Sequence, residues 1–299
     1  MKIFVWILLF LLVINVIAAL ITVFRKPRSI SSVLAWMMTL IFLPGIGFII
    51  YLFCGRGIDG QEVFKLSDDE KQMVQRIKEK VDIDNKKAGR DKRYDLLYDA
   101  KVLNRYFRNM DASPLAKRNS LQLFTDGQEK FQALFEDIRA AKETVHVEYY
   151  AFFNDTIGNQ FLDVLIEKLH EGVEVYLIYD PWGSPGANKK FFARYVDAGG
   201  KVAPFITSRD MIRKTRLNYH LHRKIVVIDG KIGWTGGFNV GDQYLNVTEK
   251  FGYWRDTHIR LVGTAVFSLQ EIFIMDWNAS VKYPEERMTY HEKYFKIGR

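Results

Sequence analysis

The sequence predicts a membrane-anchored α/β protein, and three observations support this prediction. Two long uncharged segments stand near the N-terminus, from Ile3 to Phe24 and from Ser29 to Gly55. Beyond about Leu121, segments with strand and helix periodicity alternate with short connections, which is typical of an α/β sheet with parallel members. The length of 299 residues allows one anchor plus one soluble domain with a full core. We expect a membrane anchor over 1–58, a charged helical linker over 59–118 and the α/β domain over 119–299.

The two uncharged segments are long enough to be membrane spans, because about 20 apolar residues cross the hydrocarbon of a bilayer. The alternative for the first segment is a cleaved signal peptide. Its apolar run is too long for that, no small-residue cleavage site follows, and a second candidate span begins at once. The segments therefore predict an anchor of two transmembrane helices.

The second segment is less regular than the first. Pro44 falls in its C-terminal half, where proline removes a backbone hydrogen bond and kinks a helix, so a re-entrant hairpin stays open as an alternative. The side of the membrane also stays open. Arg25, Lys26 and Arg28 favour a cytoplasmic connection between the segments. Basic residues after the second segment favour the opposite arrangement, namely Lys65, Lys71, Arg76, Lys78 and Lys80.

The positive charge of the chain is concentrated near its N-terminus. The formal net charge is +8, but the first 58 residues contain five basic and no acidic residues. The remainder has 38 basic and 35 acidic residues, which indicates an ordinary soluble surface and excludes a strongly basic nucleic-acid-binding face. The single cysteine, Cys54, excludes an intrachain disulfide and a thiolate metal cluster.

The α/β domain is expected to consist of regularly alternating elements. Residues 84–93 are interpreted as an exposed connector that precedes it. Asp229-Gly230 lies between two apolar runs, which is a strong signal for a β-hairpin. We expect helices over about 128–142, 157–170, 189–198 and 265–277, and strands over about 144–153, 173–178, 202–206, 223–228, 231–235 and 256–262.

The chemistry of the chain is concentrated around the hairpin strand. His222 and Lys224 are two residues apart, so on a strand they project from one face. An imidazole can attack phosphorus and form a phospho-enzyme, while an ammonium stabilises the charge that develops on the phosphoryl oxygens. With Asp229, which follows five residues after the lysine, they form our candidate catalytic set. This grouping points to cleavage of a phosphodiester.

Further residues near this strand support the same chemistry. Asn239 offers a neutral donor to phosphoryl oxygens, and Asp256 offers a carboxylate that can fix the histidine tautomer. Asp229 has a simpler alternative role as the first residue of the hairpin turn. His146 is interpreted as a satisfied, half-buried side chain, and His220 as a bystander.

The segment resembles the phospholipase D superfamily, whose HxKxxxxD motif is followed by G-[SG]-x-N. The matching residues are His222, Lys224, Asp229, Gly236, Gly237 and Asn239, with Gly237 in place of the commoner serine. Along essentially the whole chain, the spans with Pro44 to Gly47 and the segments 125–127, 145–150, 179–184 and 253–258 resemble the bacterial cardiolipin synthases.

The resemblance implies a fold, a reaction and a place in the cell. The fold would be a phospholipase D-like mixed sheet flanked by helices. Two phosphatidylglycerol molecules would give cardiolipin and glycerol without a metal or other cofactor, and His222 would carry the phosphatidyl group. Gly237 would support substrate binding together with Asn239 and Asp256. The protein would be a multi-pass protein of a bacterial cell membrane, with phospholipid rather than nucleic acid as its partner.

The chain departs from this family in having one motif where members have two. His291 and Lys293 repeat the HxK spacing without the aspartate, and His258 is followed by Arg260 instead of lysine. We therefore expect either a homodimer that pairs two copies of the motif, or an incomplete cardiolipin synthase that needs a separate second half. A non-catalytic membrane protein and, more weakly, a single-motif nuclease stay open as alternative functions.

Overall fold

The computed structural model describes most of the chain in several stretches. The described ranges are 29–55 without 44, 66–88, 115–205, 220–247 and 252–298, together with isolated positions near the N-terminus, around residue 104 and at 249. Two compact units are present, one formed by residues 1–63 and 207–219 and the other by residues 64–206 and 220–299. Each unit is considered by itself.

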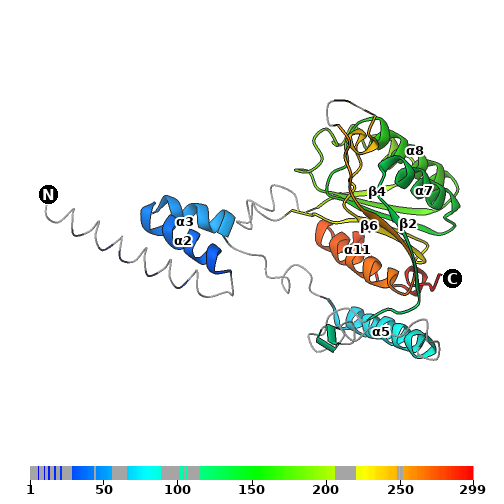
Figure 1. Cartoon of the computed structure of the whole chain (residues 1–299), viewed down its shortest axis with the longest axis horizontal. Helices are drawn as coiled ribbons and strands as arrows, with labels where there is room; N and C mark the ends of the chain where they lie inside the picture. Colours follow the sequence, from blue (N-terminus) through cyan, green and yellow to red (C-terminus); the bar gives the residue numbers. More distant parts are fainter. Residues whose placement is uncertain are drawn as a thin grey trace. The chain divides into compact units, whose positions relative to one another are not determined.

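The larger unit is built on a seven-stranded mixed sheet (Figure 1), with the strand order β1-β7-β6-β5-β2-β3-β4. Strands β2, β3 and β4 are parallel, whereas β5, β6, β7 and β1 add to the sheet in antiparallel pairs. The strands are β1 (Asn119–Phe124), β2 (Thr144–Tyr149), β3 (Glu174–Tyr179), β4 (Lys201–Pro204), β5 (Lys224–Ile228), β6 (Ile232–Gly236) and β7 (His258–Gly263).

Helices cover both faces of this sheet (Figure 1). On one face lie α7 (Gly127–Ala140), α8 (Thr156–His170) and the short α9 (Ala193–Asp197), while α11 (Val266–Ser280) packs on β5, β6 and β7 from the other face. The main core lies under α7 and α8, where Phe131, Leu134 and Phe161 are almost completely buried. Among the described residues of this unit, short helical turns lie at η3 (Asp242–Leu245), η5 (Pro284–Glu286) and η6 (Glu292–Tyr294).

Local sequence explains why the chain forms α7 where the periodicity predicts a helix. Asp126 caps the N-terminus, since its carboxylate accepts hydrogen bonds from the backbone N–H groups of Gln128 and Glu129. Phe131, Leu134, Phe135 and Ile138 then recur at helical spacing, and all four are buried. The same agreement holds for α8, β3, β5, β6 and α11, whose observed bounds lie within a few residues of the expected ones.

Three elements differ from the expectation. Strand β1 was not predicted, because Leu121 and Leu123 alternate on its exposed side, at 65% and 64% exposure, so their pattern does not mark a buried face. The helix expected over 189–198 is reduced to Ala193–Asp197, because the preceding residues form turns. Strand β2 ends at Tyr149, and Phe152 contributes only an isolated bridge to Val240.

The charged helix α5 (Asp68–Ala88) belongs to the same compact unit as the sheet. The interpretation of 84–93 as an exposed connector is therefore wrong at its start. Asp84 is buried and forms an ion pair with Arg118 at 3.1 Å, while the amide of Asn85 accepts a hydrogen bond from the backbone N–H of Lys117. A connector would leave these groups in water, whereas here they fix the end of α5 to the segment that leads into β1.

The smaller unit contains the second uncharged segment as two helices instead of one. They are α2 (Ile30–Phe42) and α3 (Ile46–Ile50), and a π-helical turn, η1 (Tyr51–Gly55), continues the latter. The expected single helix over Ser29–Gly55 is thus broken between Phe42 and Ile46. The first expected span, Ile3–Phe24, lies outside the described residues apart from isolated positions. Within the described part of the chain, no helix has the length and apolarity needed to cross a bilayer.

Candidate active site

Strand pairing places His222 and Lys224 at one edge of the sheet. Lys224 stands at the start of β5, opposite Tyr149 at the end of β2. On the other side of β5, Gly236 ends β6 opposite His258, the first residue of β7. His222 precedes β5 in an extended segment, where the carbonyl of Arg223 accepts a hydrogen bond from the backbone N–H of Tyr150. These side chains therefore gather where β2 and β6 end and β5 and β7 begin.

His222 is exposed at this edge, which suits a nucleophile that must reach a substrate. Its ring lies against the ring of Tyr150, with the centroids 4.9 Å apart. The positive charge of Lys224, with a smaller contribution from burial, lowers the pKa of His222 below its ordinary value. The imidazole is therefore neutral at pH 7, the form that carries a free lone pair for attack on phosphorus.

Lys224 is buried next to the histidine, with 3% of its surface exposed. Its ammonium Nζ donates a hydrogen bond to the backbone carbonyl of His222 at 3.0 Å and lies 5.3 Å from the centre of the Tyr150 ring. Burial lowers the pKa of Lys224 to about 8, and the negative charge of Asp256 partly opposes this shift. A partly desolvated cation at this position interacts more strongly with an anionic phosphoryl group than a solvated one would.

A loop after β3 holds the segment that presents the histidine, a role that the sequence analysis did not assign to it. The Asp180 carboxylate accepts hydrogen bonds from the backbone N–H of Leu221 at 2.8 Å and of Trp182 at 2.8 Å. The Ser184 hydroxyl donates to the carbonyl of Tyr150 at 3.1 Å and accepts from the N–H of Phe152 at 2.9 Å. The loop thus positions both the residue before His222 and the aromatic ring beside it.

Asn239 lies close to the site but uses its amide for the fold. Its Oδ1 accepts a hydrogen bond from the backbone N–H of Ala151 at 3.1 Å, and its Nδ2 donates to the Tyr244 hydroxyl at 2.7 Å. The side chain is buried, with 8% of its surface exposed. In the structure Asn239 therefore fixes the segment that follows Tyr150, so its support for the site is indirect.

The buried carboxylate of Asp276 connects the histidine segment to α11, on the other face of the sheet. Arg223 forms an ion pair with Asp276 on α11, and Asp276 has only 1% of its surface exposed. Glu148 on β2 is completely buried, and burial raises its pKa well above the ordinary value, an effect to which the Asp276 charge adds. The arginine between His222 and Lys224 is thereby anchored on a carboxylate from another element.

A cavity of about 490 Å³ opens beside His222. Its polar side is formed by His222, Arg223, Lys224, Thr235, Gly236 and Thr257, and its apolar side by Ile225, Ile259, Leu269 and Ile272. A cavity with a polar edge and an apolar wall is suited to an amphipathic substrate whose phosphate reaches the histidine. Among the described residues, no cluster of three or more histidine, cysteine, aspartate or glutamate side chains is arranged to hold a metal ion.

Asp256 occupies the space that a larger residue at Gly237 would need. A Cβ placed on Gly237 would lie 1.9 Å from Oδ1 of Asp256, far inside van der Waals contact. We expected the Asp256 carboxylate to accept a hydrogen bond from His222 and so fix its tautomer. Between these two described residues the structure has no such hydrogen bond. Its Oδ1 accepts instead from the backbone N–H of Thr257 at 2.7 Å, and its charge acts on Lys224. The absence of a side chain at Gly237 therefore leaves room for the Asp256 carboxylate.

Introducing a serine at Gly237 is expected to lower activity, although serine is the commoner residue there. The new side chain would push the Asp256 carboxylate aside and weaken its stabilisation of the Lys224 ammonium, so the pKa of Lys224 would fall below about 8. The alkaline limb of the pH–rate profile should then move to lower pH in Gly237→Ser. Asp256→Asn, which removes the charge without crowding, should shift the same limb in the same direction. An unchanged limb in both variants would contradict this account.

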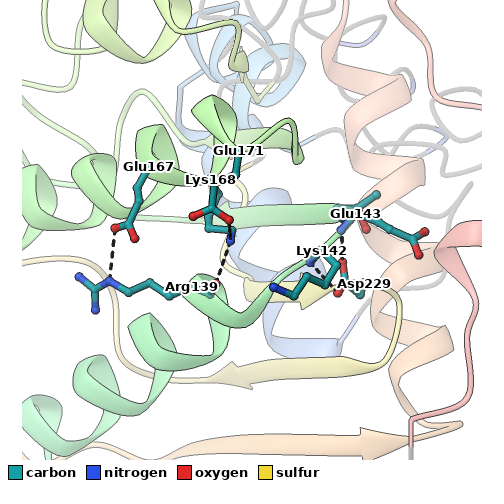
Figure 2. Close-up of polar contacts among 8 residues, drawn as sticks. Arg139, Lys142, Glu143, Glu167, Lys168, Glu171 and Asp229 are labelled. Carbon is teal, nitrogen blue, oxygen red and sulfur yellow. Dashed lines mark hydrogen bonds and ion pairs between the residues drawn. The ribbon is translucent and has the colours of Figure 1, made fainter.

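Asp229 does not lie with the other motif residues. It follows the last residue of β5, five residues beyond Lys224, which corresponds to about 16 Å along a strand. Its carboxylate accepts three hydrogen bonds, from the backbone N–H groups of Lys142, Glu143 and Thr144 at 2.8–2.9 Å. Figure 2 shows Asp229 beside Lys142 and Glu143, in the connection between α7 and β2. The expected catalytic grouping with His222 and Lys224 is thus not formed, and the hairpin-turn alternative fits the geometry.

We propose that Asp229 stabilises the fold without taking part in the reaction. Asp229→Asn keeps one acceptor oxygen and is expected to cost about 1–2 kcal/mol, since hydrogen bonds to a charged group contribute about 1.5–3 kcal/mol. Asp229→Ala should cost about 3 kcal/mol, because it loses all three bonds and places a Cβ-only side chain at a φ of 50°. Thermal unfolding of the purified protein measures this order. A folded Asp229→Asn variant with an intact melting temperature but no turnover would reverse the assignment.

His146 and His220, which the sequence analysis did not assign to catalysis, make no catalytic contact in the structure. His146 is completely buried rather than half-buried, with its Nδ1 2.9 Å from Oε1 of Gln270 and its ring stacked on Phe273. Burial lowers the pKa of His146 to about 4, so the ring is neutral. His220 lies 3.6 Å from the Asp180 carboxylate and against the Trp182 ring.

Comparison with known proteins shows which family of domains this sequence resembles. Residues 134–277 match the model of the cardiolipin synthase, phospholipase D-like domain, and residues 13–56 match that of the phospholipase D-nuclease N-terminal region. The chain therefore contains a phospholipase D-like domain of the type found in the cardiolipin synthases. The domain match includes β2 to α11 and therefore every residue of the edge described above.

Individual relatives show how much of the family's length this chain represents. It is 40% identical to a cardiolipin synthase of Listeria monocytogenes over 97% of this chain and 60% of that protein. A cardiolipin synthase of Staphylococcus aureus is also 40% identical, over 95% of this chain and 57% of that protein. The chain thus spans less than two thirds of the relatives that it matches. Among solved structures, NucT from Helicobacter pylori is 18% identical over 56% of this chain and all of that chain, with a TM-score of 0.43.

Proposed function

We propose that this chain is a phosphatidyltransferase of the cardiolipin synthase type, which joins two phosphatidylglycerol molecules to give cardiolipin and glycerol. The observation that carries the proposal is the pairing of an exposed, neutral His222 with the partly desolvated Lys224 at the mouth of an amphipathic cavity. The identity of 40% to cardiolipin synthases supports the choice of substrate.

The reaction would proceed through two displacements at one phosphorus atom. In the first, the lone pair of the His222 imidazole attacks the phosphorus of phosphatidylglycerol, the bond to the head-group oxygen breaks, and glycerol leaves with a proton. In the second, the terminal hydroxyl of another phosphatidylglycerol gives its proton to the group that protonated the glycerol and attacks the phosphatidyl-histidine. The bond between phosphorus and the imidazole breaks, which releases cardiolipin and restores the histidine. Lys224 stabilises the negative charge of the phosphoryl oxygens in both transition states.

The proton that the leaving glycerol requires has to come from a second acid. In the proposed enzyme that acid is the histidine of a second motif, contributed by a dimer mate or by a separate second half. His222 and Lys224 then form one half of a composite site. This arrangement makes turnover depend on association, because neither half has both the nucleophile and the acid.

The anchor fits the same function. Substrate and product both stay in the bilayer, so attachment through 1–58 confines the search to a surface. We propose attachment to a bacterial cell membrane, which agrees with the match of residues 13–56 to the phospholipase D-nuclease N-terminal model. Phospholipid, and not nucleic acid, would be the partner of the site, in line with the nearly balanced charge of the remaining chain.

Turnover in phosphatidylglycerol vesicles tests the proposal. The purified chain should form cardiolipin and glycerol in equal amounts, and the specific activity should fall on dilution if two copies supply the composite site. Restoration of activity in diluted samples by a separately produced second half would identify the other arrangement. A folded, demonstrably dimeric chain that turns over no phosphatidylglycerol, with or without a second half, would leave the non-catalytic alternative.

A further inference from the structure

The segment 29–55 folds back on itself as a compact pair of antiparallel helices (Figure 1). Near the open end, the rings of Trp36 and Tyr51 meet edge to face with their centroids 5.1 Å apart. Near the turn, a Cβ placed on Gly47 would lie 2.5 Å from the carbonyl oxygen of Thr39, so only glycine allows the helices to come this close. Leu40 and Tyr51 are each 1% exposed between them. The turn is therefore held by packing along both limbs.

The described outer surface of this hairpin carries many large apolar side chains. Its exposed large side chains are Ile30, Leu34, Met38, Ile41, Phe42, Leu43, Ile46, Ile49 and Ile50. No charged residue occurs from Ser29 to Gly55. The hydroxyl of Thr39, within the apolar stretch, donates to the carbonyl of Ala35 at 2.8 Å and so needs no water. Such a surface fits the hydrocarbon of a bilayer and no aqueous environment.

The hairpin is too short to reach the far side of a membrane. Helix α2 has 13 residues, and at about 1.5 Å per residue it extends about 20 Å, compared with about 30 Å of hydrocarbon. Ser29 and Gly55, at the ends of the two limbs, lie at the same end of the hairpin. An element of this kind enters the membrane from one face and returns to it.

The basic residues on both sides of the hairpin in the sequence indicate the face of the membrane from which it enters. Arg25, Lys26 and Arg28 precede the first limb, and Arg56 and Lys65 follow the second. If the segment crossed the membrane, these two basic groups would lie on opposite sides and conflict with the positive-inside rule. If the segment returns, both groups lie on the same side and agree with the rule. Lys2 is the only basic residue before Ile3–Phe24.

We infer that residues 29–55 form a re-entrant hairpin in the cytoplasmic leaflet, so that the catalytic domain lies in the cytoplasm and the N-terminus on the opposite side. The inference rests on the membrane attachment of the proposed function, but not on its chemistry. It commits the anchor to a single crossing, by Ile3–Phe24, and gives the enzyme access to phospholipid of the inner leaflet.

Cysteine labelling in native membranes tests the inference, because Cys54 is the only cysteine and already stands at the end of the second limb. The native chain is compared with Cys54→Ser carrying one of four replacements, in inside-out and right-side-out vesicles, with a membrane-impermeant maleimide. The replacements are Ser31→Cys at the start of the first limb, Ile46→Cys at the turn, Lys189→Cys in the domain and Lys2→Cys at the N-terminus.

The native chain and the Ser31→Cys and Lys189→Cys variants should react in inside-out vesicles, and Lys2→Cys in right-side-out vesicles. Ile46→Cys should react in neither until detergent is added. Labelling of native Cys54 and of Ser31→Cys from opposite faces would overturn the hairpin, and labelling of Lys189→Cys from outside would overturn the orientation. Recovery of the chain in the soluble fraction would overturn both. The same membranes are assayed for cardiolipin, and expected labelling without cardiolipin would support the topology while contradicting the proposed chemistry.

Discussion

Replacement of His222 by alanine is expected to abolish cardiolipin formation, with a loss of roughly 10⁴-fold or more, the scale observed when a nucleophile or its catalytic base is removed. The physical reason is that His222 is the only histidine among the described residues lining the cavity, whereas His258 at the same edge is buried. Release of glycerol and formation of cardiolipin should both stop, since both steps require the phosphatidyl-histidine. The measurement is the initial rate of glycerol release in the preparation that turns over phosphatidylglycerol.

A matched control separates the chemistry from damage to the fold. His170 is exposed in the last turn of α8, away from the reacting edge, so His170→Ala should keep nearly full activity. His222 is itself exposed, and its replacement should leave the melting temperature almost unchanged. Comparable activity of folded His222→Ala and His170→Ala variants would remove His222 from the mechanism.

The second large effect is expected at Lys224. Lys224→Met should lower kcat/KM by roughly 10²–10³-fold, the usual cost of removing one group that stabilises transition-state charge. Lys224→Arg should retain more activity, because it keeps a positive charge near the phosphoryl oxygens. Equal losses in the two variants would indicate that the size of the side chain, and not its charge, is what the reaction needs.

The pH dependence gives an independent test of the same residue. The protonated ammonium is the active form, and the pKa of Lys224 is lowered to about 8, so activity should fall as the pH rises through about 8. On the acid side the neutral imidazole is the active form. Because the pKa of His222 lies below its ordinary value of 6.5, activity should be lost only below that pH. In Lys224→Arg the alkaline fall should move to higher pH while the acid limb stays in place.

The sequence predicted those parts of the fold and site in which local pattern and tertiary packing agree. Alternation and helical spacing identified β3, β5, β6, α7, α8 and α11, since in each the apolar residues point to the core. The pairing of His222 with Lys224 followed from the two-residue period of a strand. Strand β1 was not predicted from the sequence. Leu121 and Leu123 are exposed at the edge of the sheet, so their alternation does not identify a buried face.

Other features depend on contacts between residues far apart in the chain. Spacing alone placed Asp229 with the motif, but strand length separates it from Lys224, and its partners are the backbone N–H groups of 142–144. The hydrogen bond from the backbone N–H of Leu221 to Asp180 joins residues 41 positions apart. No local sequence pattern predicts it. A carboxylate followed by turn residues, as in Asp180 to Ser184, was the only available signal. The close approach of Asp256 to Gly237 likewise required coordinates.

The central claim is that His222 carries the phosphatidyl group, and trapping that adduct tests it most directly. The protein is mixed with phosphatidylglycerol labelled at phosphorus, quenched in base, in which phosphohistidine survives, and digested for mass spectrometry. We predict a label on the peptide that contains His222, formed as fast as glycerol is released and absent from His222→Ala. Turnover at the full rate without a labelled His222 peptide, or with the label on another residue, would contradict the account.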